Sequence, residues 1–354
     1  MALDIFLLLV GMVLLVKGAD LFVGGSSRIA KAMRVPSLVI GLTLVSMGTS
    51  APEASVSIIG AVNGMNDLSV GNVVGSNIFN TLLILGVSGA ILPLAIGRDV
   101  KRFDIPAMLA IYAVLLIFAF VVTPLKLDIF EAVILLVMFA AYTAFLIVRA
   151  VRANKKTQIT PSGIACGDGA AEQSCEKTDA PQTAAPAPIE AQSDNEGNRA
   201  KNKRSLPLWA SAILTAVGLA GIIFGGDLVV DSASGIAKAL GMSEALVGLT
   251  IVAVGTSLPE LVTSVVAAVK KENDIAVGNI IGSNIFNIAF ILGLSSAISA
   301  PMFDWAMLTD MLVMLGSGIL VLAAAVFIKS VARWQGIAMA AMYVGYLAYI
   351  IIRN

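Results

Sequence analysis

Long apolar stretches separated by short polar segments make up most of this chain of 354 residues. Ten such stretches lie at residues 2–22, 36–60, 70–92, 105–123, 127–148, 207–226, 243–268, 277–299, 306–328 and 334–352. A helix needs about 20 apolar residues to cross a bilayer, so each stretch predicts a transmembrane helix. The alternation over roughly ten residues that is typical of membrane β-barrel strands is missing. We therefore expect an all-α integral membrane protein with ten transmembrane helices.

The chain contains an internal repeat. Residues 41–88 align without gaps on residues 248–295, and 27 of the 48 aligned positions are identical. Each half holds five of the ten stretches, so the second half would enter the membrane from the opposite side. The sequence thus predicts two inverted five-helix repeats, at residues 1–149 and 207–354.

The distribution of Lys and Arg predicts the orientation, because cytoplasmic segments carry an excess of both. With the N-terminus outside, 19 of these residues fall on the inner side and 3 on the outer side. Both termini are then external. The first stretch has no basic residues before it and exceeds the apolar part of a signal peptide, which favours a retained helix.

Residues 150–206 differ from the rest because they are rich in Ala, Pro, Gln and charged residues. Such a composition cannot bury enough apolar surface to fold, so we expect a disordered cytoplasmic linker. Both cysteines, Cys166 and Cys175, fall within it.

The composition excludes several classes of function. The chain is 58% hydrophobic and 13% charged, against roughly 25% charged residues in soluble domains, which argues against a soluble enzyme. A net charge of zero argues against nucleic-acid binding, and the absence of His removes His-based metal sites and catalytic triads.

Two acidic residues, Glu53 and Glu260, lie far from the ends of their stretches. A charge at the bilayer centre costs about 2.5–3.5 kcal/mol on insertion scales, so a functional role is the default interpretation. Each follows a proline, in GTSAPE and GTSLPE, and the proline removes a helical hydrogen bond. The predicted result is a broken helix with free carbonyls beside a carboxylate, and such hard oxygens suit sodium and calcium.

Polar residues around the two acids follow helical spacing. The first broken helix and the one after it carry Ser46, Ser50, Glu53 and Ser57, then Asn72, Ser76 and Asn80. The second half repeats this pattern with Ala253, Ser257, Glu260 and Ser264, then Asn279, Ser283 and Asn287. Asn77 and Asn284 lie beside these stripes. Such stripes on adjacent helices could assemble a ring of oxygens, in which calcium and sodium would compete for shared ligands.

The paired GTS-x-PE and GN-x-x-GSN-x-FN segments resemble the α-repeats of the calcium/cation antiporter superfamily, and within it the bacterial calcium/sodium antiporters. The resemblance implies exchange of cytoplasmic calcium for external sodium across the bacterial inner membrane. It also implies alternating access, with the first and sixth helices sliding past a fixed core.

The resemblance further implies a role for each matching residue. Glu53 and Glu260 match calcium ligands; Thr49, Thr256, Ser46 and Ala253 match backbone-oxygen ligands; Ser50, Ser76, Ser257 and Ser283 match sodium-site hydroxyls; Asn80 and Asn287 match the polar centre of the site. Some relatives, including potassium-dependent exchangers, carry Asp at the position of Asn287. The amide here argues against potassium dependence and leaves one fewer negative charge.

Two other functions stay open. A buried carboxylate can also take up a proton, so a proton-coupled antiporter of calcium or another divalent cation is the alternative; the hydroxyls at the sodium positions favour sodium. A cation channel is the third, and inverted repeats favour a carrier over it. We expect no enzymatic activity and no cofactor. The expected partners are calcium, sodium and the lipid bilayer, with no nucleic acid and no partner protein.

Overall fold

The computed structural model describes residues 2–158, 207–240, 253–328 and 330–353. The cysteines and most of the predicted linker, residues 159–206, lie outside the described residues, as does the first part of the stretch 243–268.

Helices make up almost all of the described chain, and several contain wider π-helical turns, labelled η. The first half consists of α1 (Ala2–Met33), α2 (Ser37–Ile40), η1 (Gly41–Val45), α3 (Ser46–Thr49), α4 (Ala51–Val62), α5 (Asn66–Ile78), η2 (Phe79–Ile84), α6 (Leu85–Ile91), β1 (Leu94–Ala95), η3 (Val100–Asp104), α7 (Ile105–Ile117), η4 (Phe118–Val122) and α8 (Ile129–Gln158). The second half consists of α9 (Leu208–Ala239), α11 (Ala253–Gly255), α12 (Leu258–Val269), α13 (Asn273–Ile285), η6 (Phe286–Leu292), α14 (Gly293–Ile298), α15 (Trp305–Phe327), β2 (Ser330–Val331) and α16 (Arg333–Arg353).

Eight helices of the described chain are long and apolar enough to cross a membrane. They correspond to all predicted stretches except 36–60 and 243–268. The first of these exceptions is divided into short helical pieces, and only part of the second is described. The all-α membrane fold is therefore confirmed, whereas the number of ten helices stays a prediction.

The predicted breaks lie at the two proline motifs. Ser50 separates α3 from α4 with a non-helical ψ of 12°, and Ser257 precedes α12 with a ψ of 6°. Pro52 and Pro259 each occupy the first turn of the helix that follows. This position tolerates proline because an N–H there has no helical acceptor.

Two helical segments form the centre of the molecule. Within the continuous helical segment Asn273–Ile298, 94% of an apolar stretch of 18 residues is buried inside the protein. In the segment Asn66–Ile91 the corresponding share is 72%. The other six candidate spans range only from 17% to 39%, so most of their apolar surface faces outward, as expected for helices in contact with lipid. The buried pair is where polar side chains can meet away from lipid.

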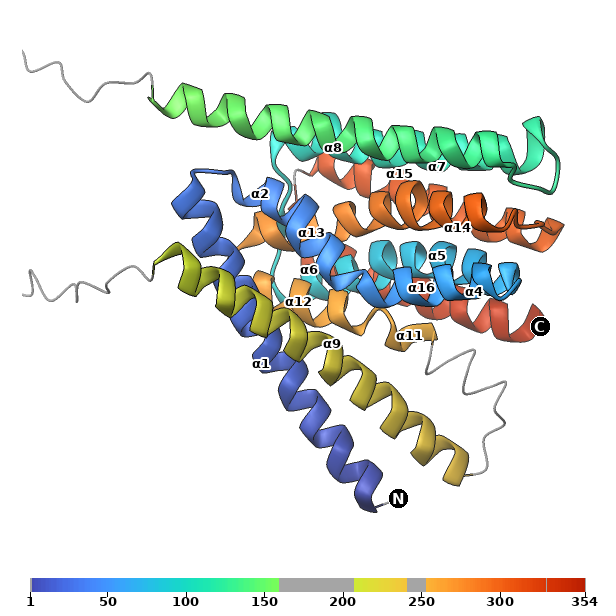
Figure 1. Cartoon of the computed structure of the whole chain (residues 1–354), viewed down its shortest axis with the longest axis horizontal. Coiled ribbons are helices and arrows are strands. Elements are labelled where there is room, and N and C mark those ends of the chain that lie inside the picture. Colours follow the sequence, from blue (N-terminus) through green and yellow to red (C-terminus); the bar gives the residue numbers. More distant parts are fainter. Residues whose placement is uncertain (1, 159–206, 241–252, 329, 354) are drawn as a thin grey trace, which may run out of the picture.

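The helices α1 and α9 pack against each other at an angle to the rest of the bundle (Figure 1). They run antiparallel: Gly11 contacts Gly225, Gly18 contacts Gly218, and further along Gly25 contacts Ser211. A Cβ on Gly18 would lie 2.8 Å from the carbonyl oxygen of Gly218. Close backbone approach therefore depends on glycine at this crossing.

Ion pairs join the last two helices of each half. Arg149 contacts Asp104 at 3.1 Å, and Tyr142 donates to the same carboxylate. In the second half Arg353 contacts Asp310 at 3.0 Å, and Tyr346 donates to Asp310. The helix α8 continues past the predicted end of its stretch, so that Arg149 lies within it.

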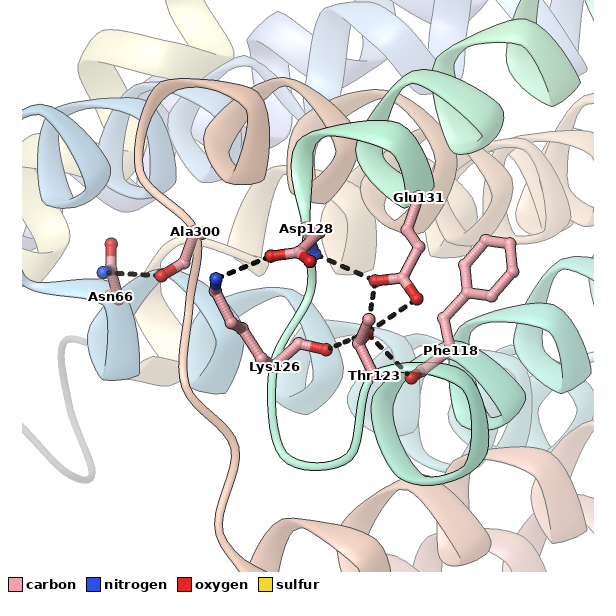
Figure 2. A network of polar contacts seen from close by, with 7 residues as sticks. All are labelled: Asn66, Phe118, Thr123, Lys126, Asp128, Glu131 and Ala300. Atoms are coloured by element: carbon pink, nitrogen blue, oxygen red, sulfur yellow. Dashed lines mark hydrogen bonds and ion pairs between the residues drawn. The ribbon is translucent and has the colours of Figure 1, made fainter.

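A polar network closes the loop before α8 (Figure 2). The Thr123 hydroxyl lies 2.6 Å from a carboxylate oxygen of Glu131, and the same carboxylate accepts the backbone N–H of Asp128. Glu131 thus caps the first turn of α8. The loop also pairs with the segment before α15, through the bridge between Lys126 and Met302.

Candidate functional site

The two buried acids lie in equivalent first turns of the helices that follow the breaks, Glu53 in α4 and Glu260 in α12. Both side chains are fully buried, and each carboxylate lies within hydrogen-bonding distance of the serine that precedes the other acid's helix. The N-terminal end of a helix carries partial positive charge, which favours a carboxylate there. The fold therefore gathers two carboxylates at one buried place, one from each half.

Each carboxylate accepts a hydrogen bond from the other half. The Ser50 hydroxyl donates to Glu260 over 2.7 Å, and the Ser257 hydroxyl donates to Glu53 over 2.8 Å. Ser50 and Ser257 are the residues at the helix breaks, so the non-helical turn points each hydroxyl across to the opposite helix. The two repeats are thereby joined by a reciprocal pair of short, charge-assisted hydrogen bonds.

The central buried helices supply the remaining predicted hydroxyls. Ser76 of α5 lies 3.1 Å from the Ser257 hydroxyl. Ser283 of α13 donates to the backbone carbonyl of Ser46 over 3.4 Å. Both serines are buried. Of the four predicted sodium-site hydroxyls, those of Ser50 and Ser257 contact the acids directly, and that of Ser76 contacts Ser257.

The buried oxygens of the described chain that have no hydrogen-bond donor include four of the proposed ligands. These four are the second carboxylate oxygens of Glu53 and Glu260 and the amide oxygens of Asn80 and Asn287. A buried polar atom without a partner is unfavourable by several kcal/mol on typical transfer scales. Carboxylate and amide oxygens are the ligands that calcium and sodium prefer, so this donor set fits a hard cation as cargo.

The predicted polar centre, Asn80 and Asn287, lies within the π-helical turns η2 and η6. Asn287 donates from its amide to Asn77 over 3.4 Å. Asn284, beside it, donates to Thr81 over 2.8 Å. No sequence pattern indicated Thr81, because the aligned residue of the second half is Ile288.

The threonines of the two motifs also contact the opposite half. Thr49 is buried and its hydroxyl lies 3.1 Å from the amide oxygen of Asn279, whereas Thr256 lies 3.5 Å from that of Asn72. Ala253 is the first described residue of the stretch 243–268 and begins α11. The two asparagines belong to the predicted polar stripes but not to the predicted ligands.

The chain is similar to known proteins over nearly all of its length. The sequence profile described as "Sodium/calcium exchanger protein" matches residues 3–148 and 210–352. The sodium/calcium exchanger MaX1 of Methanosarcina acetivorans is 34% identical, with 97% of each chain covered. The inner membrane protein YrbG of Escherichia coli is 35% identical, over 84% of this chain and 81% of that protein.

Among solved structures, the fold resembles that of the sodium–calcium exchanger NCX_Mj soaked without sodium and calcium. The TM-score is 0.77 at 29% sequence identity, and 99% of each chain is covered.

Proposed function

The chain belongs to the sodium/calcium exchanger protein family, and from this premise we propose that it exchanges calcium for sodium across a membrane by alternating access. The observation that carries the proposal is the reciprocal pairing of Ser50 with Glu260 and of Ser257 with Glu53. This pairing leaves one oxygen of each carboxylate without a donor among the described residues.

The chemistry of these side chains matches the cargo. Two carboxylates offset the two charges of calcium, and surrounding oxygens can complete the 6–8 ligands that calcium takes. The proposed ligands are Glu53, Glu260, Thr49, Thr256, Ser50, Ser257, Ser76, Ser283, Asn80, Asn287, Ser46 and Ala253. Sodium ions would use the same hydroxyls and carbonyls, so the two cargoes would compete for one site. Such competition couples their opposite movements.

The proposed architecture is two inverted five-helix repeats, at residues 1–149 and 207–354, with the linker 150–206 between them. The antiparallel crossing of α1 and α9 supports the inversion, because these are the first helices of the two halves. With the termini outside, 19 Lys and Arg residues fall on the inner side and 3 on the outer side, which supports external termini and a cytoplasmic linker. The proposed location is the inner membrane of a bacterial cell.

The test is uptake of radioactive calcium into proteoliposomes loaded with sodium. An outward sodium gradient should drive calcium uptake, and a proton gradient in its place should not. Uptake driven by a proton gradient alone would show that protons, not sodium, are the coupling ion. Calcium currents through single channels would show that the protein is a channel and not a carrier.

The variants Glu53→Gln and Glu260→Gln should each reduce uptake to background, because calcium would then meet only one carboxylate. Glu131→Gln is the matched control: Glu131 is also a buried glutamate, but it caps α8. Expression and thermal unfolding of each variant would be measured alongside. Full residual transport in either site variant would refute the proposed site.

A further inference from the structure

Two asparagines, Asn72 and Asn279, join the halves of the molecule through both ends of their amides. The amide N–H of Asn279 donates to Ser264 of its own half over 2.9 Å, and the amide oxygen lies 3.1 Å from the Thr49 hydroxyl of the other half. Asn72 makes the equivalent contacts, donating to Ser57 over 2.9 Å and lying 3.5 Å from Thr256. Asn72 aligns with Asn279, Ser57 with Ser264 and Thr49 with Thr256 in the internal repeat, so the two sets of contacts are equivalent.

The contact competes with hydrogen bonds inside the broken helix. The Thr49 hydroxyl has one proton, and it also lies 3.1 Å from the carbonyl of Val45 and 3.3 Å from that of Ser46. When the amide oxygen of Asn279 accepts this hydrogen bond, the hydroxyl no longer donates to the carbonyl of Val45 or of Ser46. The amide therefore gives the Thr49 hydroxyl an acceptor in the opposite half. The Ser46 carbonyl, a proposed ligand, is then left with the Ser50 N–H and the Ser283 hydroxyl as its donors.

We propose that Asn72 and Asn279 are positioning residues, which hold the two ligand-bearing turns in register through Thr256 and Thr49. This inference rests on the proposed exchange activity. The amides act through the threonines and are not themselves ligands. Loss of the contact should therefore weaken cation binding more than it slows the transport cycle.

The contact between Asn279 and Thr49 differs from that between Asn72 and Thr256 in length and in burial. Asn279 is fully buried and makes the shorter contact, whereas Asn72 is only half-buried. Asn72 also donates to the backbone carbonyl of Glu53 over 3.3 Å. Substitution of Asn279 should accordingly have the larger effect on cation affinity.

The experiment measures calcium uptake by proteoliposomes over a range of calcium concentrations, which separates KM from the maximal rate. Asn279→Leu and Thr49→Val each remove one partner of the same hydrogen bond, and Thr49→Val keeps the backbone carbonyl. Each should raise KM about tenfold, the equivalent of about 1.4 kcal/mol, with a maximal rate within about twofold of the unmodified protein. A purely structural role would lower the maximal rate, through the amount of folded protein, and leave KM unchanged.

Three further variants make the result specific. The double variant should raise KM no more than either single one, because both changes remove one interaction. Thr49→Ser keeps the hydroxyl and should restore KM. Thr43→Val is the matched control, because the Thr43 hydroxyl bonds only to the carbonyl of Val39 in its own helix among the described contacts.

Unchanged KM in both Asn279→Leu and Thr49→Val would overturn the inference, as would additive effects in the double variant. If Asn279→Leu fails to fold, the comparison of Thr49→Val with Thr49→Ser decides the matter alone. Failure of the unmodified protein to take up calcium in exchange for sodium would instead refute the proposed function.

Discussion

At the scale of single residues, the amide of Asn287 leaves the proposed site with two carboxylates instead of three. Its amide donates to Asn77 over 3.4 Å, and its amide oxygen has no donor among the described residues. Asn287→Asp would add a third carboxylate to the proposed ligands Glu53 and Glu260. We expect a lower KM for calcium and a lower maximal rate, because an extra charge in a site shielded from water holds a divalent cation more tightly and slows its release.

Competition measurements would check this prediction, with sodium, potassium and strontium each added to the calcium-uptake assay. The control is Asn66→Asp, which makes the same change at an amide that bonds to the carbonyl of Ala300 in a loop. An unchanged cation profile for Asn287→Asp would show that the position does not contact the cargo.

The identities of the buried acids could be predicted from the sequence, whereas their hydrogen bonds could not. Glu53 and Glu260 stand out because a charge in the middle of an apolar stretch needs a reason and because the motif is duplicated. The reciprocal bonds from Ser50 and Ser257 depend on how two broken helices lie against each other. Residue spacing gives the face of a helix but not the neighbour that this face meets.

At the scale of elements, regular helical spacing explains only part of the polar stripes. Asn72 and Ser76 follow the spacing of an ordinary helix in α5, but Asn80 lies beyond it in the wider turn η2. The second half places Asn287 in the equivalent turn η6. A π-helical turn rotates the following side chains relative to a regular helix, and such turns are frequent at functional sites. No apolar period in the sequence signals this extra width.

The crossing of α1 and α9 gives a testable prediction at this scale. A Cβ on Gly18 would lie 2.8 Å from both the carbonyl oxygen of Gly218 and the backbone nitrogen of Ile222. Backbone atoms cannot rotate away, so Gly18→Ala must push the helices apart. We expect a loss of about 1–3 kcal/mol in the free energy of unfolding, typical of overpacked sites.

Thermal unfolding in detergent would measure this loss. Gly345→Ala is the control, because a Cβ there would meet nothing within 4 Å and alanine favours a helix over glycine. Equal stability of the Gly18→Ala and Gly345→Ala variants would show that the crossing does not depend on close backbone contact.

At the scale of the whole molecule, hydrophobicity predicted the membrane class but not the interruption of its spans. The stretch 36–60 is long and apolar enough to predict one continuous span, yet it is divided at Ser50 between α3 and α4. Mean hydropathy does not detect a missing helical hydrogen bond, whereas the proline at position 52 indicates one. The two most buried spans, Asn66–Ile91 and Asn273–Ile298, carry the asparagine and serine stripes, because polar groups there face protein instead of lipid.

The orientation can be tested with the cysteines that the chain already has. Cys166 and Cys175 fall in the predicted cytoplasmic linker, and both lie outside the described residues. A membrane-impermeant maleimide should therefore leave intact cells unlabelled and should label the protein after permeabilisation. The physical reason is the excess of Lys and Arg on this side, which is retained in the cytoplasm during insertion.

A cysteine at position 126, in a variant with both native cysteines replaced by serine, tests the opposite side. Lys126 lies just before α8 and its side chain is 46% exposed, so Lys126→Cys should react in intact cells. Only the span α8 separates this position from the linker, and a single crossing must place the two on opposite sides. Labelling of both positions from the same side would show that α8 does not cross the membrane, and two five-helix repeats could then not be inverted.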